Sequence, residues 1–164
     1  MLLGSNDNFI GEIWGKIAWK GNEIPNGDVE KQRQERESPV RKILVIDDEP
    51  LLIDLLINLL SLFGYQVDSA LDYQEASGKL KDQTYDLIFL DMKMPLMDGR
   101  RLYLKIKEYI PALAKRIVFL TGDAGNKETF DFISGTKNFY LGKPFTIKEV
   151  KDLLDRFFNT PEKP

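Results

Sequence analysis

The clearest pattern along the chain is a series of short apolar runs, each followed by a longer segment with helical spacing. Residues 43–46, 87–90 and 117–120 are uninterrupted runs of branched, leucine or aromatic side chains. Such runs are typical of parallel strands that are buried on both faces of a sheet. Shorter strands are expected at 66–70 and 138–141, so the pattern predicts five strands.

The segments between these strands have the spacing of helices. Residues 51–63 are apolar nearly all round, with Pro50 in the first turn and Gly64 at the end. Further helices are expected at 73–81, 100–108, 127–134 and after Thr146, which caps the last one. Strand–helix alternation repeated five times predicts the α/β class, with a (βα)5 doubly wound parallel sheet and right-handed crossovers.

The first 39 residues have a different texture. Residues 10–20 fit a helix and a strand equally well, and the charged run at 28–37 predicts a solvated linker or an exposed helical extension. Ser38-Pro39 ends this part of the chain. We therefore expect an N-terminal extension at 1–39, a domain at 40–160 and a tail at 161–164.

Composition restricts the chemistry more than the fold. A chain of 164 residues is about the length of one domain. It contains no cysteine, which excludes disulfides and thiolate sites. It contains no histidine, which excludes Ser-His-Asp catalysis, histidine metal sites and a phosphohistidine on this chain. Any reaction must therefore use carboxylates, hydroxyls, lysines or backbone groups.

The charge balance bears on partners and location. A net charge of −3 and a pI of about 5.1 argue against a broad nucleic-acid footprint, which needs a basic face. No stretch reaches the roughly 18–20 apolar residues of a membrane span. The first eight residues lack the pattern of a signal peptide, so a cytoplasmic location without direct membrane contact is expected.

Reactive side chains stand at the carboxyl ends of the predicted strands, where ligands bind in sheets of this kind. Asp47 and Asp48 follow the first strand and Asp91 follows the third, while Thr121 and Lys143 follow the fourth and fifth. A single acidic residue at such a place is usually a helix cap, and Asp48 could cap the first helix. The joint occurrence on several strands instead predicts one site.

Three neighbouring carboxylates favour a cation, and oxygen ligands of this kind select Mg²⁺ or Mn²⁺. Thr121 and the amide of Gly122 are donors suited to a phosphoryl oxygen, and Lys143 supplies a positive charge. An aspartate in such a set can act as a nucleophile and form an acyl phosphate. The site therefore predicts phosphoryl transfer.

Residues 41–159 resemble the receiver domain of two-component response regulators. The resemblance is carried by VIDDEP (45–50), FLDMKMPLMDG (89–99), FLTGD (119–123) and LGKPF (141–145), in this order. It implies the flavodoxin-like strand order 2-1-3-4-5. It also implies that the domain receives a phosphoryl group from a histidine kinase or phosphotransfer protein and signals through residues 127–158. That face could also form a homodimer.

The resemblance implies a role for each site residue. Asp91 would be the phosphoacceptor. Asp48, Asp91 and the carbonyl of Lys93 would hold the metal directly, and Asp47 would hold it through a water. Lys143 would pair with the phosphoryl group and precede a cis peptide bond to Pro144. Thr121 and Gly122 would bind the phosphoryl group, and movement of Thr121 would let Tyr140 turn inward, although an aromatic residue on a short edge strand can also be simple packing.

Two positions beside the site vary within the family pattern. Lys93 stands two residues after Asp91, and Asp123 stands two residues after Thr121. Both flank the path of the hydrolytic water, so a Lys93–Asp123 pair is expected to tune the lifetime of the acyl phosphate.

Other readings stay open from the sequence. A phosphorylation-independent docking module of receiver fold is one alternative. A hydrolase with an aspartyl nucleophile would need a different acidic motif after the first strand, and a flavodoxin relative would need a hydroxyl-rich phosphate loop there. Residues 121–145 look like receivers attached to hybrid sensor kinases, in which case 1–39 would end a kinase domain. By itself the chain lacks a phosphodonor histidine and ATP-binding glycine boxes, so it is not expected to be a kinase.

Overall fold

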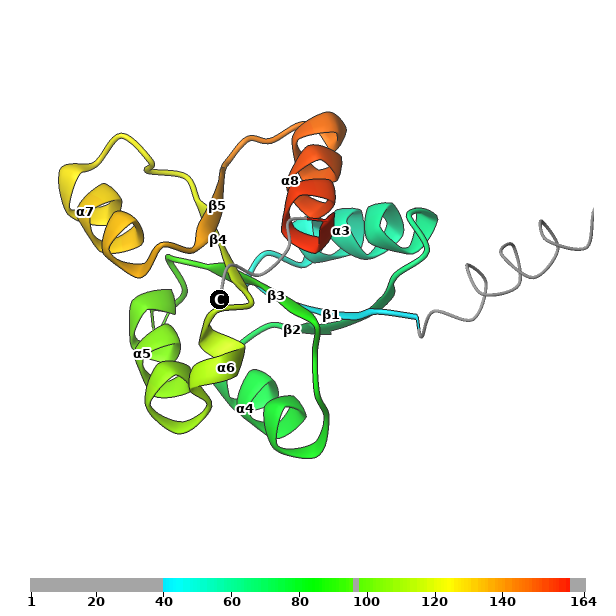
Figure 1. Cartoon of the computed structure of the whole chain (residues 1–164), viewed down its shortest axis with the longest axis horizontal. Helices are drawn as coiled ribbons and strands as arrows, with labels where there is room; N and C mark the ends of the chain where they lie inside the picture. Colours follow the sequence, from blue (N-terminus) through cyan, green and yellow to red (C-terminus); the bar gives the residue numbers. More distant parts are fainter. Residues whose placement is uncertain (1–39, 96–97, 160–164) are drawn as a thin grey trace, which may run out of the picture. The chain divides into compact units, whose positions relative to one another are not determined.

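Five parallel strands form one sheet in the order β2-β1-β3-β4-β5 (Figure 1). The computed structural model describes residues 40–95 and 98–159. The α/β class and the strand order predicted from the sequence are therefore confirmed. The strands are β1 (Lys42–Ile46), β2 (Gln66–Ala70), β3 (Leu87–Asp91), β4 (Ile117–Thr121) and β5 (Phe139–Gly142).

The three central strands are buried on both faces, which explains their uninterrupted apolar runs. Side chains alternate between the two faces of a strand. One face carries Leu44, Ile46, Ile88, Leu90 and Phe119. The other face carries Ile43, Val45, Phe89, Val118 and Leu120. All ten side chains are inaccessible to solvent, so the sheet needs a layer of helices on each side.

Helices cover both faces (Figure 1). The face with Val45 and Phe89 packs against α3 (Pro50–Leu62) and α8 (Ile147–Asn159). The opposite face packs against α4 (Tyr73–Asp82), α5 (Gly99–Tyr109), α6 (Pro111–Ala114) and α7 (Lys127–Thr136). The short helix α6 was not expected from the sequence, and the other bounds differ from the expected ones by only one or two residues.

The helix ends follow from local chemistry. Asp72, Asp98 and Asn126 cap α4, α5 and α7 by accepting hydrogen bonds from backbone amides of the first turn. Gly64 follows α3 with a φ of 88°, a conformation that favours glycine. The alternative that Asp48 caps α3 is wrong. Glu49 occupies the cap position and makes no side-chain capping bond. The Asp48 carboxylate is therefore not used for that purpose.

Helix α3 is only partly buried, although its sequence is apolar nearly all round. Ile53, Leu56 and Leu60 pack into the core. In contrast, 85% of Leu51 and 83% of Leu62 remain exposed, and Leu55 is half exposed. The helix therefore offers leucine side chains to solvent.

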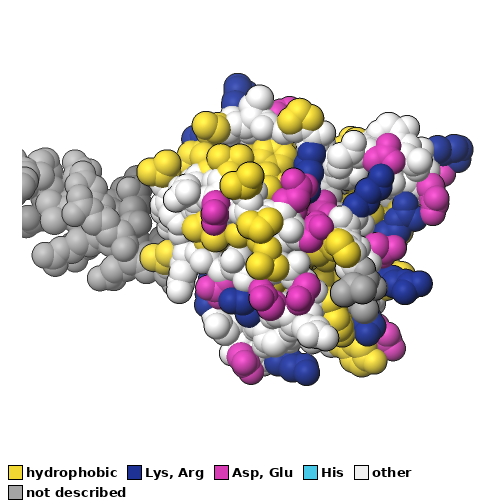
Figure 2. Space-filling view, turned by 180° about the vertical axis from the view of Figure 1, so that it is seen from behind, with side chains coloured by type: hydrophobic (Ala, Val, Ile, Leu, Met, Phe, Trp, Pro, Cys, Tyr) yellow, Lys and Arg dark blue, Asp and Glu magenta, His cyan; other side chains and the backbone are white. Residues whose placement is uncertain are grey.

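The surface carries both signs of charge. Figure 2 shows one face of the molecule, where basic and acidic side chains are interspersed and hydrophobic side chains gather in several patches. Among the described residues, no helix is long and apolar enough to cross a membrane. The expected extension at 1–39 and the tail at 161–164 lie outside the described residues.

Helix α5 starts in direct contact with the backbone of Asp91. A Cβ atom at Gly99 would lie 2.1 Å from the carbonyl oxygen of Asp91 and 3.0 Å from the Cα of Met92. The amide of Gly99 donates a hydrogen bond to the Met92 carbonyl at 3.2 Å. Only glycine fits at this position, and the close approach fixes α5 against the end of β3.

Replacing Gly99 is expected to damage the fold, whereas replacing Gly78 is not. Gly99→Ala forces a methyl group onto backbone atoms, so we expect the free energy of unfolding to fall by roughly 3 kcal/mol, the upper end of the usual cost of overpacking. Gly78 lies within α4, and a methyl group added there would meet nothing within 4 Å. Gly78→Ala is expected to stabilise by about 0.5–1 kcal/mol. Urea denaturation of both variants tests this, and equal stabilities would contradict it.

Candidate functional site

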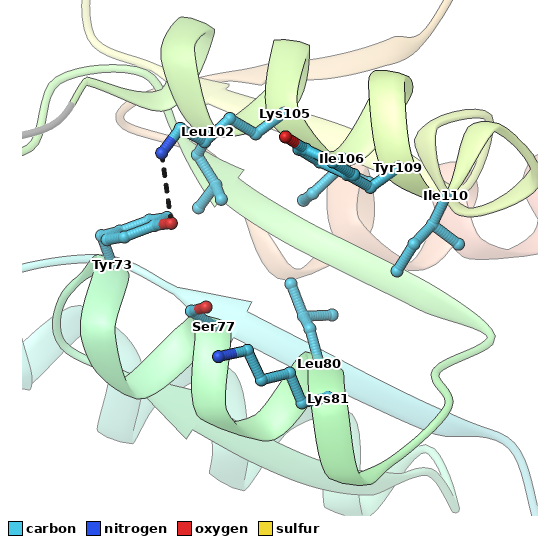
Figure 3. Close-up of a pocket in the computed structure, with 9 residues that line it drawn as sticks. All are labelled: Tyr73, Ser77, Leu80, Lys81, Leu102, Lys105, Ile106, Tyr109 and Ile110. Atoms are coloured by element: carbon cyan, nitrogen blue, oxygen red, sulfur yellow. Dashed lines mark hydrogen bonds between the residues drawn. The ribbon is translucent and has the colours of Figure 1, made fainter.

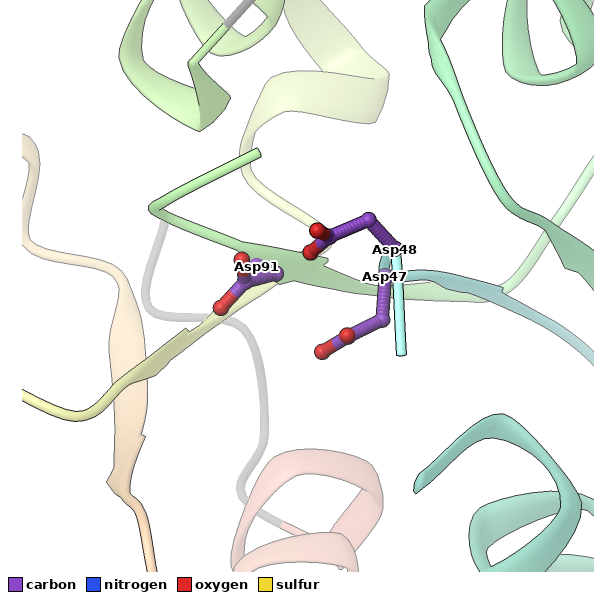
Figure 4. Close-up of side chains that lie close together, drawn as sticks. All are labelled: Asp47, Asp48 and Asp91. Atoms are coloured by element: carbon purple, nitrogen blue, oxygen red, sulfur yellow. The ribbon is translucent and has the colours of Figure 1, made fainter. Parts of the chain in front are cut away.

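Three aspartates meet at the carboxyl end of the sheet (Figure 4). Asp47 and Asp48 directly follow β1, and Asp91 is the last residue of β3, the neighbouring strand. One carboxylate oxygen from each of the three residues lies within 4.8 Å of the others. The cluster that the sequence predicted at this edge is therefore formed.

Lys143 lies among the carboxylates of the site. It directly follows β5, and its Nζ is 2.7 Å from Asp47 Oδ2 and 2.9 Å from Asp91 Oδ1. A third carboxylate, Glu49, lies 3.4 Å from the same nitrogen. The ammonium group thus connects the ends of three strands and neutralises part of the charge that they bring together.

Asp47 is fully buried, and both of its oxygens are occupied. Oδ1 accepts a hydrogen bond from the Glu49 amide at 2.9 Å, and Oδ2 accepts the bond from Lys143. Asp48 is more exposed than Asp47. The two neighbours therefore differ: Asp47 fixes the lysine and the start of α3, while Asp48 is partly exposed.

The pKa values of Asp91 and Lys143 are both displaced upward. Burial raises the pKa of the Asp91 carboxyl, the hydrogen bond from Lys143 opposes this only in part, and the charge of Asp47 adds to it. Burial alone would lower the pKa of Lys143, but the bonds to Asp47 and Asp91 outweigh burial and raise it. The lysine therefore stays charged, while the ionised form of Asp91 is disfavoured.

The cluster fits a divalent cation. Carboxylate oxygens suit Mg²⁺ and Mn²⁺. Octahedral Mg²⁺ binds oxygens at about 2.0–2.1 Å, so two opposite ligands are about 4 Å apart. Neighbouring ligands of the octahedron are only about 2.9 Å apart. Asp47, Asp48 and Asp91, with oxygens within 4.8 Å of one another, would therefore draw closer to hold the ion, or one of them would bind it through a water. A cation would also relieve the repulsion among them.

Thr121 and its neighbours form the other side of the site. Thr121 ends β4 and is 1% exposed. Its Oγ1 accepts a hydrogen bond from the Asp123 amide at 3.1 Å, and its carbonyl accepts one from the Lys143 amide at 2.7 Å. Nothing lies within 4 Å of a Cβ atom built at Gly122, so the backbone there is open. The peptide bond between Lys143 and Pro144 is cis.

An ion pair joins the two loops that flank Asp91. Lys93 Nζ lies 3.2 Å from Asp123 Oδ2, and the two side chains are 69% and 42% exposed. The backbone amide of Lys93 also donates a hydrogen bond to Asp91 Oδ2 at 3.0 Å. Lys93 therefore contacts the aspartate through its amide and the loop after β4 through its side chain.

Tyr140 lies on β5 and points away from the core, with 43% of its surface exposed. It is not in the charged cluster. The structure thus brings together Asp47, Asp48, Asp91 and Lys143, and it puts Thr121 on the adjoining strand end.

Two residues near the site were missed in the sequence. Glu49 directly follows the aspartate pair, so its position could have drawn attention to it. Arg100 gave no signal. Its guanidinium lies 2.6 Å from Glu128 Oε1 and 3.3 Å from Thr129 Oγ1, and so connects the start of α5 with the first turn of α7. Only the packing of two distant helices shows this contact.

Comparison with known proteins gives a consistent family. The response regulator receiver domain matches residues 43–155. The chain is 39% identical over 114 residues to the sensor protein EvgS of Escherichia coli K12, covering 70% of this chain and 9% of EvgS. It is 28% identical over 162 residues to hybrid signal transduction histidine kinase L of Dictyostelium discoideum, covering 94% and 9%. The chain therefore spans a small fraction of these relatives.

Solved structures agree with the sequence comparisons. The response regulator TrrA of Thermotoga maritima, solved in complex with Mg(2+)-BeF, is 30% identical with a TM-score of 0.64, covering 73% of this chain and all of TrrA. A two-component response regulator from Clostridium difficile is 26% identical with a TM-score of 0.67, covering 75% and 99%. With its strand order and its acidic edge, the chain belongs to the response regulator receiver domain family.

Proposed function

We propose that this receiver domain accepts a phosphoryl group on Asp91 from a phosphohistidine of a histidine kinase or phosphotransfer protein. One observation carries the proposal. Asp91 shares the acidic cluster and the contact with Lys143 with Asp47, but Asp47 is fully buried, whereas Asp91, 2.9 Å from Lys143, remains 4% exposed and so can meet a donor. A nucleophile for phosphoryl transfer needs this combination of fixed position and nearby positive charge.

The reaction forms one bond and breaks another. An oxygen of Asp91 attacks the phosphorus atom, the phosphorus–nitrogen bond to the donor imidazole breaks, and the nitrogen keeps the electron pair. The product is an acyl phosphate on Asp91. Because these 164 residues contain no histidine, the donor lies outside them. The later hydrolysis of the acyl phosphate by water makes the domain self-dephosphorylating.

The chain's own groups supply charge and position. Lys143 would move from the carboxylates to a phosphoryl oxygen, which keeps the site close to neutral. The Thr121 hydroxyl and the Gly122 amide would donate to the other oxygens.

Asp48, Asp91 and the Lys93 carbonyl would hold Mg²⁺ or Mn²⁺ directly, and Asp47 would do so through a water. The cation would neutralise charge on the transferring group. The TrrA structure in complex with Mg(2+)-BeF supports this reading.

The exposed leucines of α3 support a docking place for the donor. Beside Lys143 lies a hollow of about 380 Å³, whose lining includes Leu52, Leu55 and Pro144. Leu51, on the next turn towards the start of α3, is 85% exposed. An apolar surface adjoining the phosphoacceptor would position a helical donor with its histidine over Asp91.

The signal to a downstream protein would pass through another surface beside the site, formed by α7, β5 and α8. Movement of Thr121 toward the phosphoryl group would vacate space for Tyr140, which is half exposed in this structure. The change would alter the face formed by α7, β5 and α8, residues 127–158, for a downstream protein or a second copy of the chain.

A second candidate concerns the parent protein. The match to a hybrid histidine kinase covers 94% of this chain, including part of residues 1–39. It supports the proposal that the domain works as the receiver of a hybrid sensor kinase. Phosphorylation-independent docking is the alternative, and treatment with a small phosphodonor distinguishes it from phosphoryl transfer.

Acetyl phosphate should add one phosphoryl group to the chain in the presence of Mg²⁺ but not of EDTA. We expect intact-mass spectrometry to detect this gain in the wild type and in Asp54→Asn, an exposed control on α3. Asp91→Asn should show no gain because the attacking carboxylate is gone. Modification of Asp91→Asn, or an unmodified wild type with Mg²⁺ present, would favour the docking module.

Removing the charge of Asp91 should stabilise the metal-free protein. Because the folded-state pKa of Asp91 is raised, the folded protein binds more protons than the unfolded chain, and stability falls as pH rises above about 3.8 through the folded-state pKa. At pH 7 in EDTA, Asp91→Asn should therefore have a higher free energy of unfolding than the wild type, because Asp47 still pairs with Lys143. Asp54→Asn should match the wild type.

Urea titrations with and without MgCl₂ measure this effect. Mg²⁺ should stabilise the wild type by mass action and should affect Asp91→Asn less. A destabilised Asp91→Asn protein would refute the assigned charge balance.

Breaking the ion pair between Lys93 and Asp123 should shorten the life of the acyl phosphate, because the pair partly screens the path of water to Asp91. An exposed ion pair contributes about 0.2–1 kcal/mol, so Lys93→Ala should speed hydrolysis by at most about fivefold. The exchanged double variant K93D/D123K should recover part of the loss. Decay of the phosphorylated species, followed by mass spectrometry, measures this. An unchanged rate in Lys93→Ala would count against the assignment.

A further inference from the structure

A groove runs between α4 and α5, on the face of the sheet opposite to α3 (Figure 3). It encloses about 350 Å³. Its apolar lining comes from both helices and from the residue that follows α5, and consists of Leu80, Leu102, Ile106 and Ile110 with the rings of Tyr73 and Tyr109. Nothing assigned to the phosphoacceptor lies in it.

The lining residues follow helical spacing on both walls. Helix α5 contributes Leu102, Lys105, Ile106 and Tyr109, and α4 contributes Tyr73, Ser77, Leu80 and Lys81. On α5 this stripe spans about seven residues, or about 10 Å of helix axis. A third helix of two turns, with apolar residues three and four positions apart, matches this length and fills the space between two helices.

Large apolar side chains remain uncovered at one end of the groove. Tyr109 is 75% exposed and Ile110 is 40% exposed, although both line the same hollow. At the other end, Lys105 Nζ lies 3.3 Å from the Tyr73 hydroxyl and joins the two walls, as the dashed line in Figure 3 shows. The two helices are thus linked by a hydrogen bond at one end of the groove, while apolar side chains are exposed at the other end.

The charge of the groove indicates which kind of ligand would fit it. Among the described residues, those lining it include two lysines, Lys81 and Lys105, and no carboxylate. This local balance is opposite to the net charge of −3 of the chain. A ligand with acidic residues beside an apolar stripe would satisfy both lysines and cover the apolar surface.

We propose that the groove between α4 and α5 binds an acidic amphipathic helix of a partner protein. The partner presents leucine-like residues at positions i, i+3 or i+4, and i+7 to the apolar lining, and glutamate or aspartate residues to Lys81 and Lys105. This interaction is independent of the phosphoryl chemistry at Asp91 and gives the domain a second docking surface.

Synthetic helical peptides test the proposal on the full chain. The probe carries a leucine stripe flanked by glutamates, and two matched peptides carry lysines in place of the glutamates or alanines in place of the leucines. Backbone NMR shifts locate the binding, and fluorescence anisotropy measures affinity. The K81E/K105E variant removes the charge match, and Tyr109→Ala removes an apolar contact. Lys107→Glu and Leu104→Ala are controls on α5 at positions outside the groove lining.

The expected result is specific in three respects. The acidic peptide shifts the amides of Leu80, Leu102 and Ile106, and neither matched peptide does. K81E/K105E weakens binding by at least roughly tenfold, and Tyr109→Ala weakens it severalfold. The two controls stay within about twofold. All four variants still gain a phosphoryl group from acetyl phosphate, which separates this test from that of the phosphoacceptor.

Three outcomes would overturn the proposal. The first is equal binding of the acidic and lysine-bearing peptides. The second is a set of shifts confined to other surfaces. The third is self-association of the wild type that the K81E/K105E variant abolishes, since the groove would then be covered by a second copy of the chain.

Discussion

The contact of Lys143 with Asp47 and Asp91 is the interaction on which the rest of the site depends. Two nearly buried carboxylates from neighbouring strands would repel each other strongly without the ammonium group between them. The lysine comes from the end of β5, on the far side of β4. The same contact therefore neutralises the site and ties the edge of the sheet to its centre. A ligand that binds Lys143 in place of the carboxylates would change both the charge of the site and the link between β5 and the central strands.

Packing connects the site to the helices. Gly99 rests against the carbonyl of Asp91, and the next residue, Arg100, contacts Glu128 and Thr129 on α7. The end of β3 and the first turn of α7 are thus joined by two consecutive residues. A second connection runs from Asp91 through Lys143 to β5, the strand that carries Tyr140 and contacts α8. Asp91 therefore has two connections of different chemistry: a steric contact with Gly99 and an ion pair with Lys143.

The sequence predicted most of what periodicity and strand-end chemistry control. Uninterrupted apolar runs identified the central strands because both faces of the sheet are covered, and Asp91 and Lys143 stood out because parallel strands end at one edge. Three features were beyond reach. The exposure of Leu51 depends on the angle at which α3 packs, the role of Arg100 depends on a neighbour 28 residues away, and α6 is a single turn without periodicity.

The sheet separates two surfaces that could otherwise compete. Leucines of α3 lie on one face, beside Lys143, and the groove between α4 and α5 lies on the other. Because five strands stand between them, one protein can occupy each without steric conflict. A molecule held in the groove and tethered to the donor would raise the donor's effective concentration at Asp91. The domain would then act as a scaffold for a ternary assembly, in which recruitment would set the speed of signalling.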